Sequence, residues 1–198
     1  MFDPRVIANA VLDRAEERGL TVTNLDMQKI VYFLHGHFLR RHGRPLVVGE
    51  FEAWQYGPVH RVLYDAFKRF EDGPIEARAD RFDPIRQERK KLPRLDDSAA
   101  NVVIGDVVDR YLDMPTWTLV AITHGEGTPW QLTMEQAQRR VNVGMRIPNA
   151  LIAERFEGDT VRSSHADQRR VTQEDVKVSG DRPRHRGRQE PNRTRGQA

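Results

Sequence analysis

The stretch TNLDMQKIVYFLHGHFLRRHG, residues 23–43, decides how the rest of the chain can fold. Thr23 followed three residues later by Asp26 is typical of a helix start, and Gly43 ahead of Pro45 is typical of a helix end. Between these signals, apolar residues point in nearly every direction around the helix: Met27, Ile30, Val31, Tyr32, Phe33, Leu34, Phe38 and Leu39. A helix that is apolar all round must be covered on several sides. We therefore predict that this is the central helix of the domain.

Helical patterns recur on both sides of this segment. Residues 3–18 carry an apolar stripe at helical spacing, with Pro4 in the first turn and Gly19 as the stop. Downstream, helices are predicted to begin at Ser98, after Pro115-Thr116, at Thr128-Pro129 and at Asn149. The pattern predicts a mainly α (all-alpha) fold class: a compact domain of about six to seven helices.

The region between the second and fourth predicted helices has a different pattern. Residues 46–56 include a β-branched and aromatic stretch with partial alternation, which predicts a short extended or hairpin element. Gly57-Pro58 then turns the chain into a third predicted helix, with Pro58 at its first position. Residues 73–97 are charged and interrupted by prolines, so we predict a solvated connection or a poorly ordered loop there.

The C-terminal part of the chain differs in composition from the rest. Residues 159–198 contain no aromatic residue, no Leu and no Ile, so they cannot bury enough apolar area to offset the entropy of ordering. They hold ten basic and six acidic residues, which leaves 22 basic and 23 acidic residues for 1–158. We predict a folded domain over 1–158 and a disordered basic tail over 159–198, and the basic isoelectric point belongs to the tail.

Composition also limits which chemical reactions the chain can carry out and where in the cell we expect it. The chain has no cysteine, which excludes disulfides, thiolate metal sites and thiol catalysis. Its start, Met1-Phe2-Asp3-Pro4, has no basic segment before an apolar run, and no stretch approaches the roughly 18 apolar residues of a membrane span. We expect a cytoplasmic protein without a membrane partner.

Three groups of residues resemble one known family. The segment NLDMQKIVYF, residues 24–33, resembles the opening helix of the Panacea domain family, which is similar to SocA-type antitoxins and phage-associated proteins. The segment FEAWQYGPV, residues 51–59, is similar to the most recognisable part of that family, and Leu63-Tyr64 follows it. The closing pattern is matched by Tyr111, Leu119, Thr123-His124 and Pro129-Trp130. The resemblance covers about residues 5–135, in the right order.

The resemblance implies a function in protein binding. Members of the family act as antitoxins, often encoded beside a toxin, either by binding the toxin directly or, in SocA-like members, by delivering it to a protease. The resemblance brings no catalytic residues and no cofactor, so we expect a protein that is not an enzyme. The expected partner is a protein toxin encoded next door, and a protease system stays open as a second partner.

The seven histidines raise the questions of metal binding and catalysis. His35 and His37 lie two residues apart on a helix and point about 200° from one another, so they cannot share one ion. The pairs His60 with Asp65 and His124 with Glu126 could serve as acid and base, but no nucleophile motif or phosphate loop accompanies them. We expect no metal and no cofactor, and we expect His124 to orient the turn that follows its helix. A small hydrolase is the least favoured class.

Large aromatic residues with a polar edge dominate many interfaces, which makes those near the Gly-Pro segment candidates for partner binding. They are also consistent with core positions, Trp130 most of all. The candidate partner-binding residues are Trp54, Gln55, Tyr56, His60, Tyr64, His124 and Trp130. If the segment 46–56 is an exposed edge, a partner could also add a strand to it.

A second class of function rests on the tail. Arg182, Arg184, Arg186 and Arg188 form a basic cluster, and such clusters bind nucleic acid by neutralising phosphates. Without aromatic residues for stacking, the contact would be weak and independent of sequence. The alternative function is therefore a nucleic-acid-associated regulator that acts through the tail.

Overall fold

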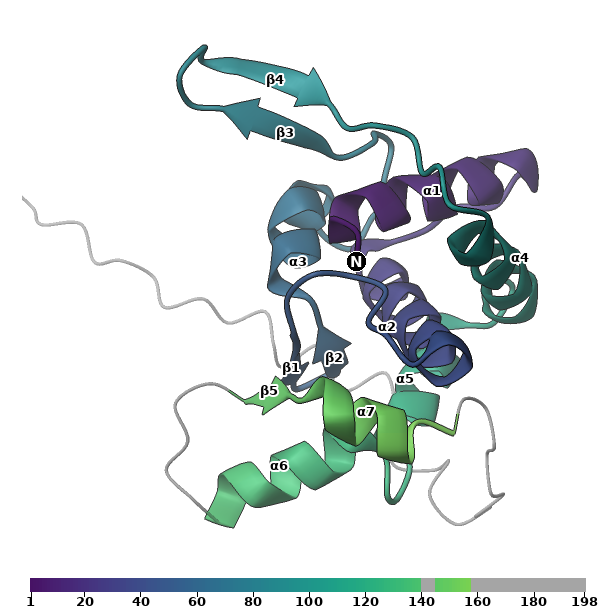
Figure 1. Cartoon of the computed structure of the whole chain (residues 1–198), viewed down its shortest axis with the longest axis vertical. Coiled ribbons are helices and arrows are strands. Elements are labelled where there is room, and N and C mark those ends of the chain that lie inside the picture. Colours follow the sequence, from purple (N-terminus) through teal and green to yellow (C-terminus); the bar gives the residue numbers. More distant parts are fainter. Residues whose placement is uncertain (140–144, 158–198) are drawn as a thin grey trace, which may run out of the picture. The chain divides into compact units, whose positions relative to one another are not determined.

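The computed structural model describes residues 1–139 and 145–157, which form the elements labelled in Figure 1. In chain order the helices are α1 (Pro4–Glu17), α2 (Asn24–His42), α3 (Arg61–Phe67), the 3-10 helix η1 (Lys68–Phe70), α4 (Ser98–Tyr111), α5 (Thr116–His124), α6 (Pro129–Arg139) and α7 (Asn149–Arg155). The strands are β1 (Phe51–Trp54), β2 (Gly57–Val59), β3 (Asp80–Asp83), β4 (Glu88–Lys91) and β5 (Arg146–Ile147).

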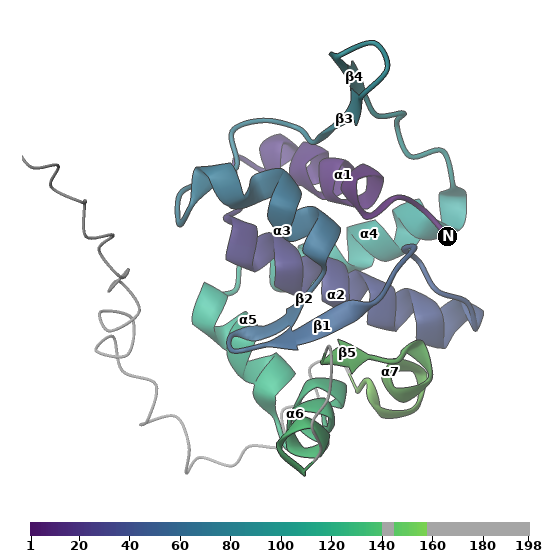
Figure 2. The same ribbon diagram turned by 90° about the vertical axis from the view of Figure 1, so that its left-hand side faces the viewer.

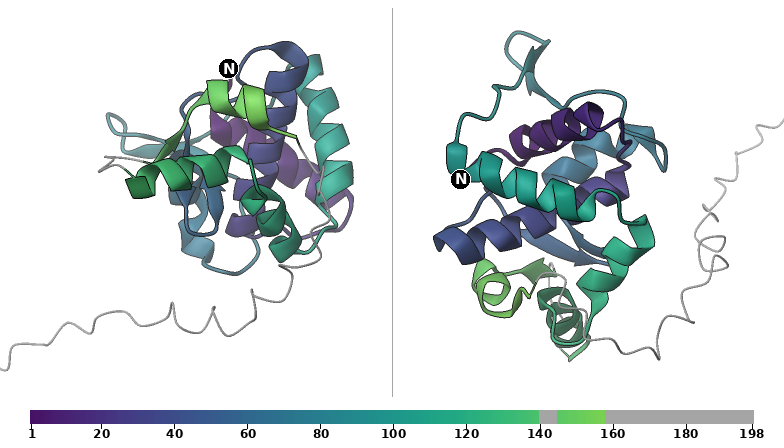
Figure 3. Two further views of the ribbon diagram at one scale, coloured as in Figure 1. Left: turned by 90° about the horizontal axis from the view of Figure 1, so that it is seen from below. Right: turned by 90° about the vertical axis from the view of Figure 1, so that its right-hand side faces the viewer.

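Helix α2 is the centre of the described domain, as predicted. Thr23 and Asp26 form the capping box at its start, and Gly43 ends it in the left-handed conformation with φ 65°. The helix packs against α1, α3, α4, α5 and α7 as well as strand β2, and Figures 2 and 3 show it enclosed among them. Its buried side chains form the middle of the hydrophobic core, which confirms the prediction of a helix covered on several sides.

A three-stranded antiparallel sheet in the order β2-β1-β5 lies beside α2. Ala53 pairs with Pro58 and donates its backbone N–H to Met145 O, at 2.7 Å, on the other side of β1. Ala53 and Pro58 therefore exchange no hydrogen bonds with each other. Because an N–H at position 58 would point away from β1, the absence of this group in proline removes no hydrogen bond between the two strands. The prediction that Pro58 begins a helix is wrong, because Pro58 lies inside β2 and α3 begins only at Arg61.

The predicted mainly α, all-alpha fold class is wrong, because the described residues form two antiparallel sheets, of three and two strands, beside the seven α-helices. The second sheet, β3–β4, lies in the region 73–97 that was predicted to be an irregular connection. Its charged residues did not suggest a strand, yet they pair across the hairpin as Arg89 with Asp80 and Lys90 with Asp83. Strand β5 was missed because its pairing partner, β1, is far away in the sequence.

Two further predictions concern the tail and the membrane. The predicted disorder of residues 159–198 and the Arg182–Arg188 cluster lie outside the described residues, and the division at residue 158 stays a prediction. Among the helices of the described residues, none combines the length and apolar character that crossing a bilayer requires.

The C-terminal end of the described domain packs against α2 at Gly36. A Cβ atom on Gly36 would lie 2.5 Å from two ring carbons of Phe156, so the ring packs directly on the helix backbone. Arg40 Nη1 donates to Phe156 O at 2.7 Å, and His35 Nε2 lies 2.9 Å from Asn149 Oδ1. Burial lowers the pKa of His35 to about 4, so His35 is neutral here at pH 7 and Nε2 can donate to the Asn149 oxygen.

We predict that Gly36→Ala destabilises the protein by about 1–3 kcal/mol, because the new methyl group forces the Phe156 ring off the helix. The measurement is the free energy of unfolding from urea denaturation. Gly105→Ala on α4 is the matched control, since nothing lies within 4 Å of its Cβ position, and it should stabilise the helix by up to about 1 kcal/mol. Equal stability of Gly36→Ala and the wild type would contradict the packing of Phe156 on α2.

Candidate functional site

The β1–β2 hairpin turns tightly through Gln55 and Tyr56, and its geometry requires glycine at the next position. Gly57 has φ 100°, which side-chain-bearing residues rarely adopt. A Cβ atom there would also lie 2.6 Å from Thr123 Oγ1 and 2.9 Å from Lys29 Nζ. The hairpin therefore lies against α2 and α5 more closely than any other residue at position 57 would permit.

Two polar side chains of α2 bond to the outer edge of β2. Lys29 Nζ donates to Pro58 O at 3.1 Å, and the backbone N–H of His60 donates to Gln28 Oε1 at 2.9 Å. Gln28 is itself oriented by Asn24, whose Oδ1 accepts from Gln28 Nε2 at 3.0 Å. These bonds occupy backbone groups that a neighbouring strand would otherwise use. We call Gln28 and Lys29 the α2 anchors of the hairpin.

Lys29 is fully buried at this position. Burial lowers the pKa of its amine to about 7, because removal from water penalises the charged form. A buried amine with one carbonyl acceptor is costly, so its place beneath the hairpin is a strong constraint on the surrounding structure. Sequence reasoning placed Lys29 in the family pattern but missed its role. The available signal was a lysine in the middle of a helix that is apolar on every face.

The turn of the hairpin is held from the other side by α5 and α6. His124 Nε2 lies 3.1 Å from Gln55 O, and Trp130 Nε1 donates to Trp54 O at 2.8 Å. The His124 and Trp130 rings contact each other, with centroids 3.7 Å apart. Burial lowers the pKa of His124, although carbonyl oxygens of Val120 and Gln55 face its ring nitrogens and act in the opposite direction. Both residues therefore fix the position of the hairpin backbone.

Aromatic side chains cover the outside of the fixed hairpin. The rings of Trp54 and Tyr64 lie 4.9 Å apart, and the Arg61 guanidinium lies over the Trp54 ring at 5.8 Å. The polar edge of Trp54 is satisfied within the hairpin, because Nε1 donates to Glu52 Oε2 at 2.7 Å. Next to the turn, Tyr56 meets the edge of Trp117, whose side chain is 41% exposed. We call Trp54, Gln55, Tyr56, Tyr64 and Trp117 the aromatic surface.

The structure divides the seven predicted partner-binding residues into two groups. Trp54, Gln55, Tyr56 and Tyr64 lie on the partly exposed aromatic surface, together with Trp117, which was not predicted as a site residue. His60, His124 and Trp130 instead bond to backbone. His60 is buried with Nε2 3.0 Å from Val48 O, and burial lowers its pKa. It therefore supports the hairpin from inside.

The remaining histidines and the sheet edge can also be placed. His35 and His37 bond to different partners, Asn149 and Tyr111, and no group of three metal-ligating side chains occurs among the residues the structure describes. Asp65, considered as a partner for His60, instead pairs with Arg61 and Lys68. Strand β1 is paired on both sides, and α2 side chains bond to the outer edge of β2. A partner strand therefore has no free edge at this hairpin.

The comparisons with known proteins place the chain in a family. The family described as "Antitoxin SocA-like, Panacea domain" matches residues 27–131, a range that contains most of α2, the β1–β2 hairpin and the residues whose side chains bond to it. The chain belongs to this family. Antitoxin SocA of Caulobacter vibrioides (strain NA1000 / CB15N) is 36% identical to it over 156 residues, which are 78% of this chain and 82% of that protein. None of the solved structures compared with the chain matches it.

The buried amine makes stability depend on pH in a testable way. Because the folded-state pKa of Lys29 is about 7 and that of an unfolded lysine is about 10.4, the unfolded state binds more protons between these values. The free energy of unfolding should therefore rise with pH over this window, by at most about 1.4 kcal/mol per pH unit. Lys29→Met should lack this rise, which urea denaturation from pH 7 to 10 measures.

Lys68→Met, which removes an exposed lysine from η1, is the matched control and should follow the wild-type curve. A constant difference in stability between the wild type and Lys29→Met at every pH would show that the buried amine does not titrate as the structure requires.

Proposed function

We propose that the protein is an antitoxin that neutralises a partner toxin by direct binding at the aromatic surface, with no chemical reaction and no cofactor. The proposal rests on the geometry of the β1–β2 hairpin, which is formed by the family's signature segment, residues 51–59. Its backbone is bonded to Lys29, Gln28, His124 and Trp130, while its aromatic side chains remain partly exposed. Membership of the SocA-like antitoxin family and the similarity to Antitoxin SocA support the same function.

The energetics of the aromatic surface favour protein binding. Trp and Tyr provide large contact areas and lose little conformational entropy when they are immobilised, and Arg61 adds a group that is common at binding hot spots. A hairpin that is already held from both sides has little freedom left to lose when a partner docks. The surface is therefore suited to recognise a folded partner with its side chains, without a change in the sheet.

Direct binding and delivery to a protease differ in what happens to the toxin. In the proposed mechanism the toxin stays intact inside the complex, so its amount in cells does not fall when the antitoxin is present. In the delivery mechanism, growth is rescued because the toxin disappears. Quantitative immunoblotting of the toxin after protein synthesis is stopped distinguishes the two.

The first experiment is growth of cells that express the neighbouring gene, alone and together with the full-length chain. The proposal predicts arrest in the first case and growth in the second. A toxic neighbour that the chain does not rescue would rule out the antitoxin function for this pair.

We predict that Trp54→Ala weakens binding of the purified toxin by roughly 30-fold, about 2 kcal/mol, because the ring is a large part of the aromatic surface and packs against Tyr64 and Arg61. Tyr56→Ala should act in the same direction. The measurement is isothermal titration calorimetry, with thermal unfolding of each variant as a check on folding. Val102→Ala is the matched control, because Val102 is an exposed apolar residue on α4 and away from the hairpin. Unchanged affinity of both aromatic variants would contradict the proposal that the toxin binds at the aromatic surface.

A further inference from the structure

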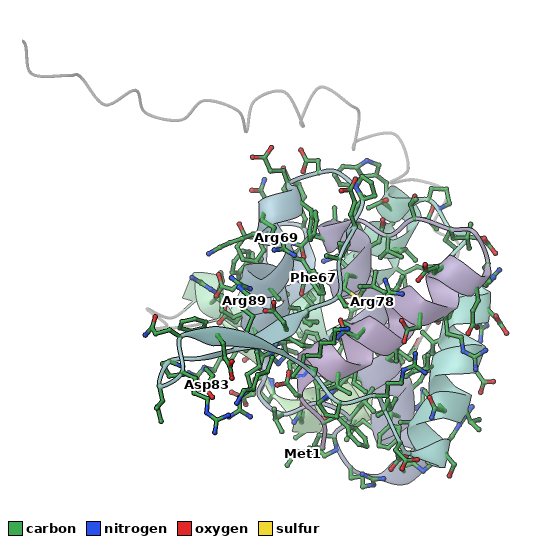
Figure 4. The ribbon with its side chains drawn as sticks, turned by 90° about the horizontal axis from the view of Figure 1, so that it is seen from above. Met1, Phe67, Arg69, Arg78, Asp83 and Arg89 are labelled. Atoms are coloured by element: carbon green, nitrogen blue, oxygen red, sulfur yellow. The ribbon has the colours of Figure 1, made fainter. Side chains whose placement is uncertain are left out.

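The β3–β4 hairpin is firmly attached at its base. Asn9 of α1 bonds to both backbone groups of Ala79, with distances of 2.9 and 2.8 Å, directly before β3 begins. Arg78 pairs with Asp13 and Glu16 of α1, and Arg5 Nη1 donates to Asp80 O at 3.1 Å. Figure 4 shows Arg78 at this base, with Arg89 and Asp83 further along the hairpin. Four residues of α1, Arg5, Asn9, Asp13 and Glu16, thus fix where the hairpin leaves the domain.

Beyond its base, the hairpin is held mainly by its own contacts, and Figures 1 and 2 show it projecting from the end of the domain near α1. The strands pair over four positions, from Asp80 with Lys91 to Asp83 with Glu88. At the turn, Asp83 Oδ1 accepts from the backbone N–H groups of Ile85 and Arg86 at 3.0 and 3.2 Å. A two-stranded hairpin without a supporting layer is at best marginally stable in water. These bonds therefore maintain a projecting shape that does not contribute to the core.

The tip of this hairpin exposes apolar side chains. Ile85 follows Pro84 in the turn and is 92% exposed, and Phe82 on β3 is 50% exposed. Neither side chain is part of the hydrophobic core. Exposed apolar residues at the end of a projecting ribbon are typical of a site that is buried by a partner.

The charge of the hairpin indicates the chemistry of that partner. Residues 80–91 contain five basic and three acidic residues. Each of the three acidic side chains pairs with a basic side chain of the same hairpin: Asp80 with Arg89, Asp83 with Lys90, and Glu88 with Arg86 and Lys90. The remaining basic residues, Arg81 and Lys91, are exposed, so the hairpin presents a net positive charge to the solvent, which is complementary to a polyanion.

From these observations we propose that the β3–β4 hairpin is a DNA-binding arm. A two-stranded ribbon fits a groove of duplex DNA, and proteins that bend DNA insert apolar side chains such as Ile, Phe or Pro between base pairs in the minor groove. In this arrangement, Arg81 and Lys91 contact phosphates, and Pro84-Ile85 at the tip forms the wedge. The arm projects from the α1 end of the domain, whereas the aromatic surface lies on the β1–β2 hairpin, so one chain can hold DNA and a protein partner together.

Binding of a mixed-sequence 30-base-pair DNA duplex to the full-length chain tests this proposal, with fluorescence anisotropy measured over a series of salt concentrations. Arg81→Gln with Lys91→Gln leaves the ion pairs of Arg86, Arg89 and Lys90 within the hairpin in place. This double variant should bind more weakly, and the slope of log affinity against log salt should fall by about 2. Ile85→Ser should weaken binding without changing the slope, and should remove DNA bending measured by energy transfer between the duplex ends.

Two control variants separate the arm from other basic residues. Arg146→Gln with Arg155→Gln changes two exposed arginines on β5 and α7 and should bind DNA like the wild type. Replacing Arg182, Arg184, Arg186 and Arg188 by Gln in the full-length chain measures the contribution of the tail. If all salt-dependent binding is lost in the tail variant and none in the arm variants, the proposal is overturned.

Antitoxin function provides an independent readout. The arm variants should still rescue growth, because they leave the aromatic surface unchanged. Arm variants that bind DNA normally but lose rescue would overturn the proposal and assign the arm to a protein partner instead. Absence of DNA binding by the wild type at 50 mM salt would also overturn it, without bearing on the antitoxin function.

Discussion

The contact between α2 and the outer edge of β2 is the constraint on which the rest of the site depends. Lys29 and Gln28 bond to backbone groups of Pro58 and His60, and they do so from the second turn of α2, the most buried helix of the described domain. A buried amine cannot easily go without its acceptor, so β2 must lie where it does. Gly57 follows from the same contact, because Lys29 and Thr123 occupy the space that a side chain would need.

This constraint links the core to the surface that we propose binds the toxin. The backbone of the hairpin is held by α2 on one side and by His124 and Trp130 on the other, so Trp54, Tyr56 and Tyr64 are presented on a support with little freedom. The family's signature segment therefore combines two roles within nine residues. Its small and buried residues fix the hairpin, and its aromatic residues face outwards.

The sequence predicted those features that depend on local signals. Caps, prolines and apolar spacing located the helices near their observed ends, and the capping box at Thr23 and the stop at Gly43 are clear examples. Features that depend on distant residues could not be predicted. Strand β5 exists because Ile147 pairs with Phe51, and Pro58 is tolerated in a strand because Ala53 bonds to Met145 instead. For the site, the aromatic residues were found from their type, whereas the sequence marks Lys29 only as a lysine within an apolar helix, and its role follows from its acceptor on β2.

Hydrogen exchange of the full-length chain, measured by mass spectrometry with and without its purified toxin, tests the central claim most directly. In the free protein, the backbone N–H groups of residues 51–60 should already exchange slowly, because α2, α5 and α6 hold the hairpin. On binding, the account predicts additional protection of residues 54–64 and of α5 around Trp117, with little change in α1 and α4. Rapid exchange of the hairpin in the free protein, or protection confined to α1 and α4 in the complex, would contradict it.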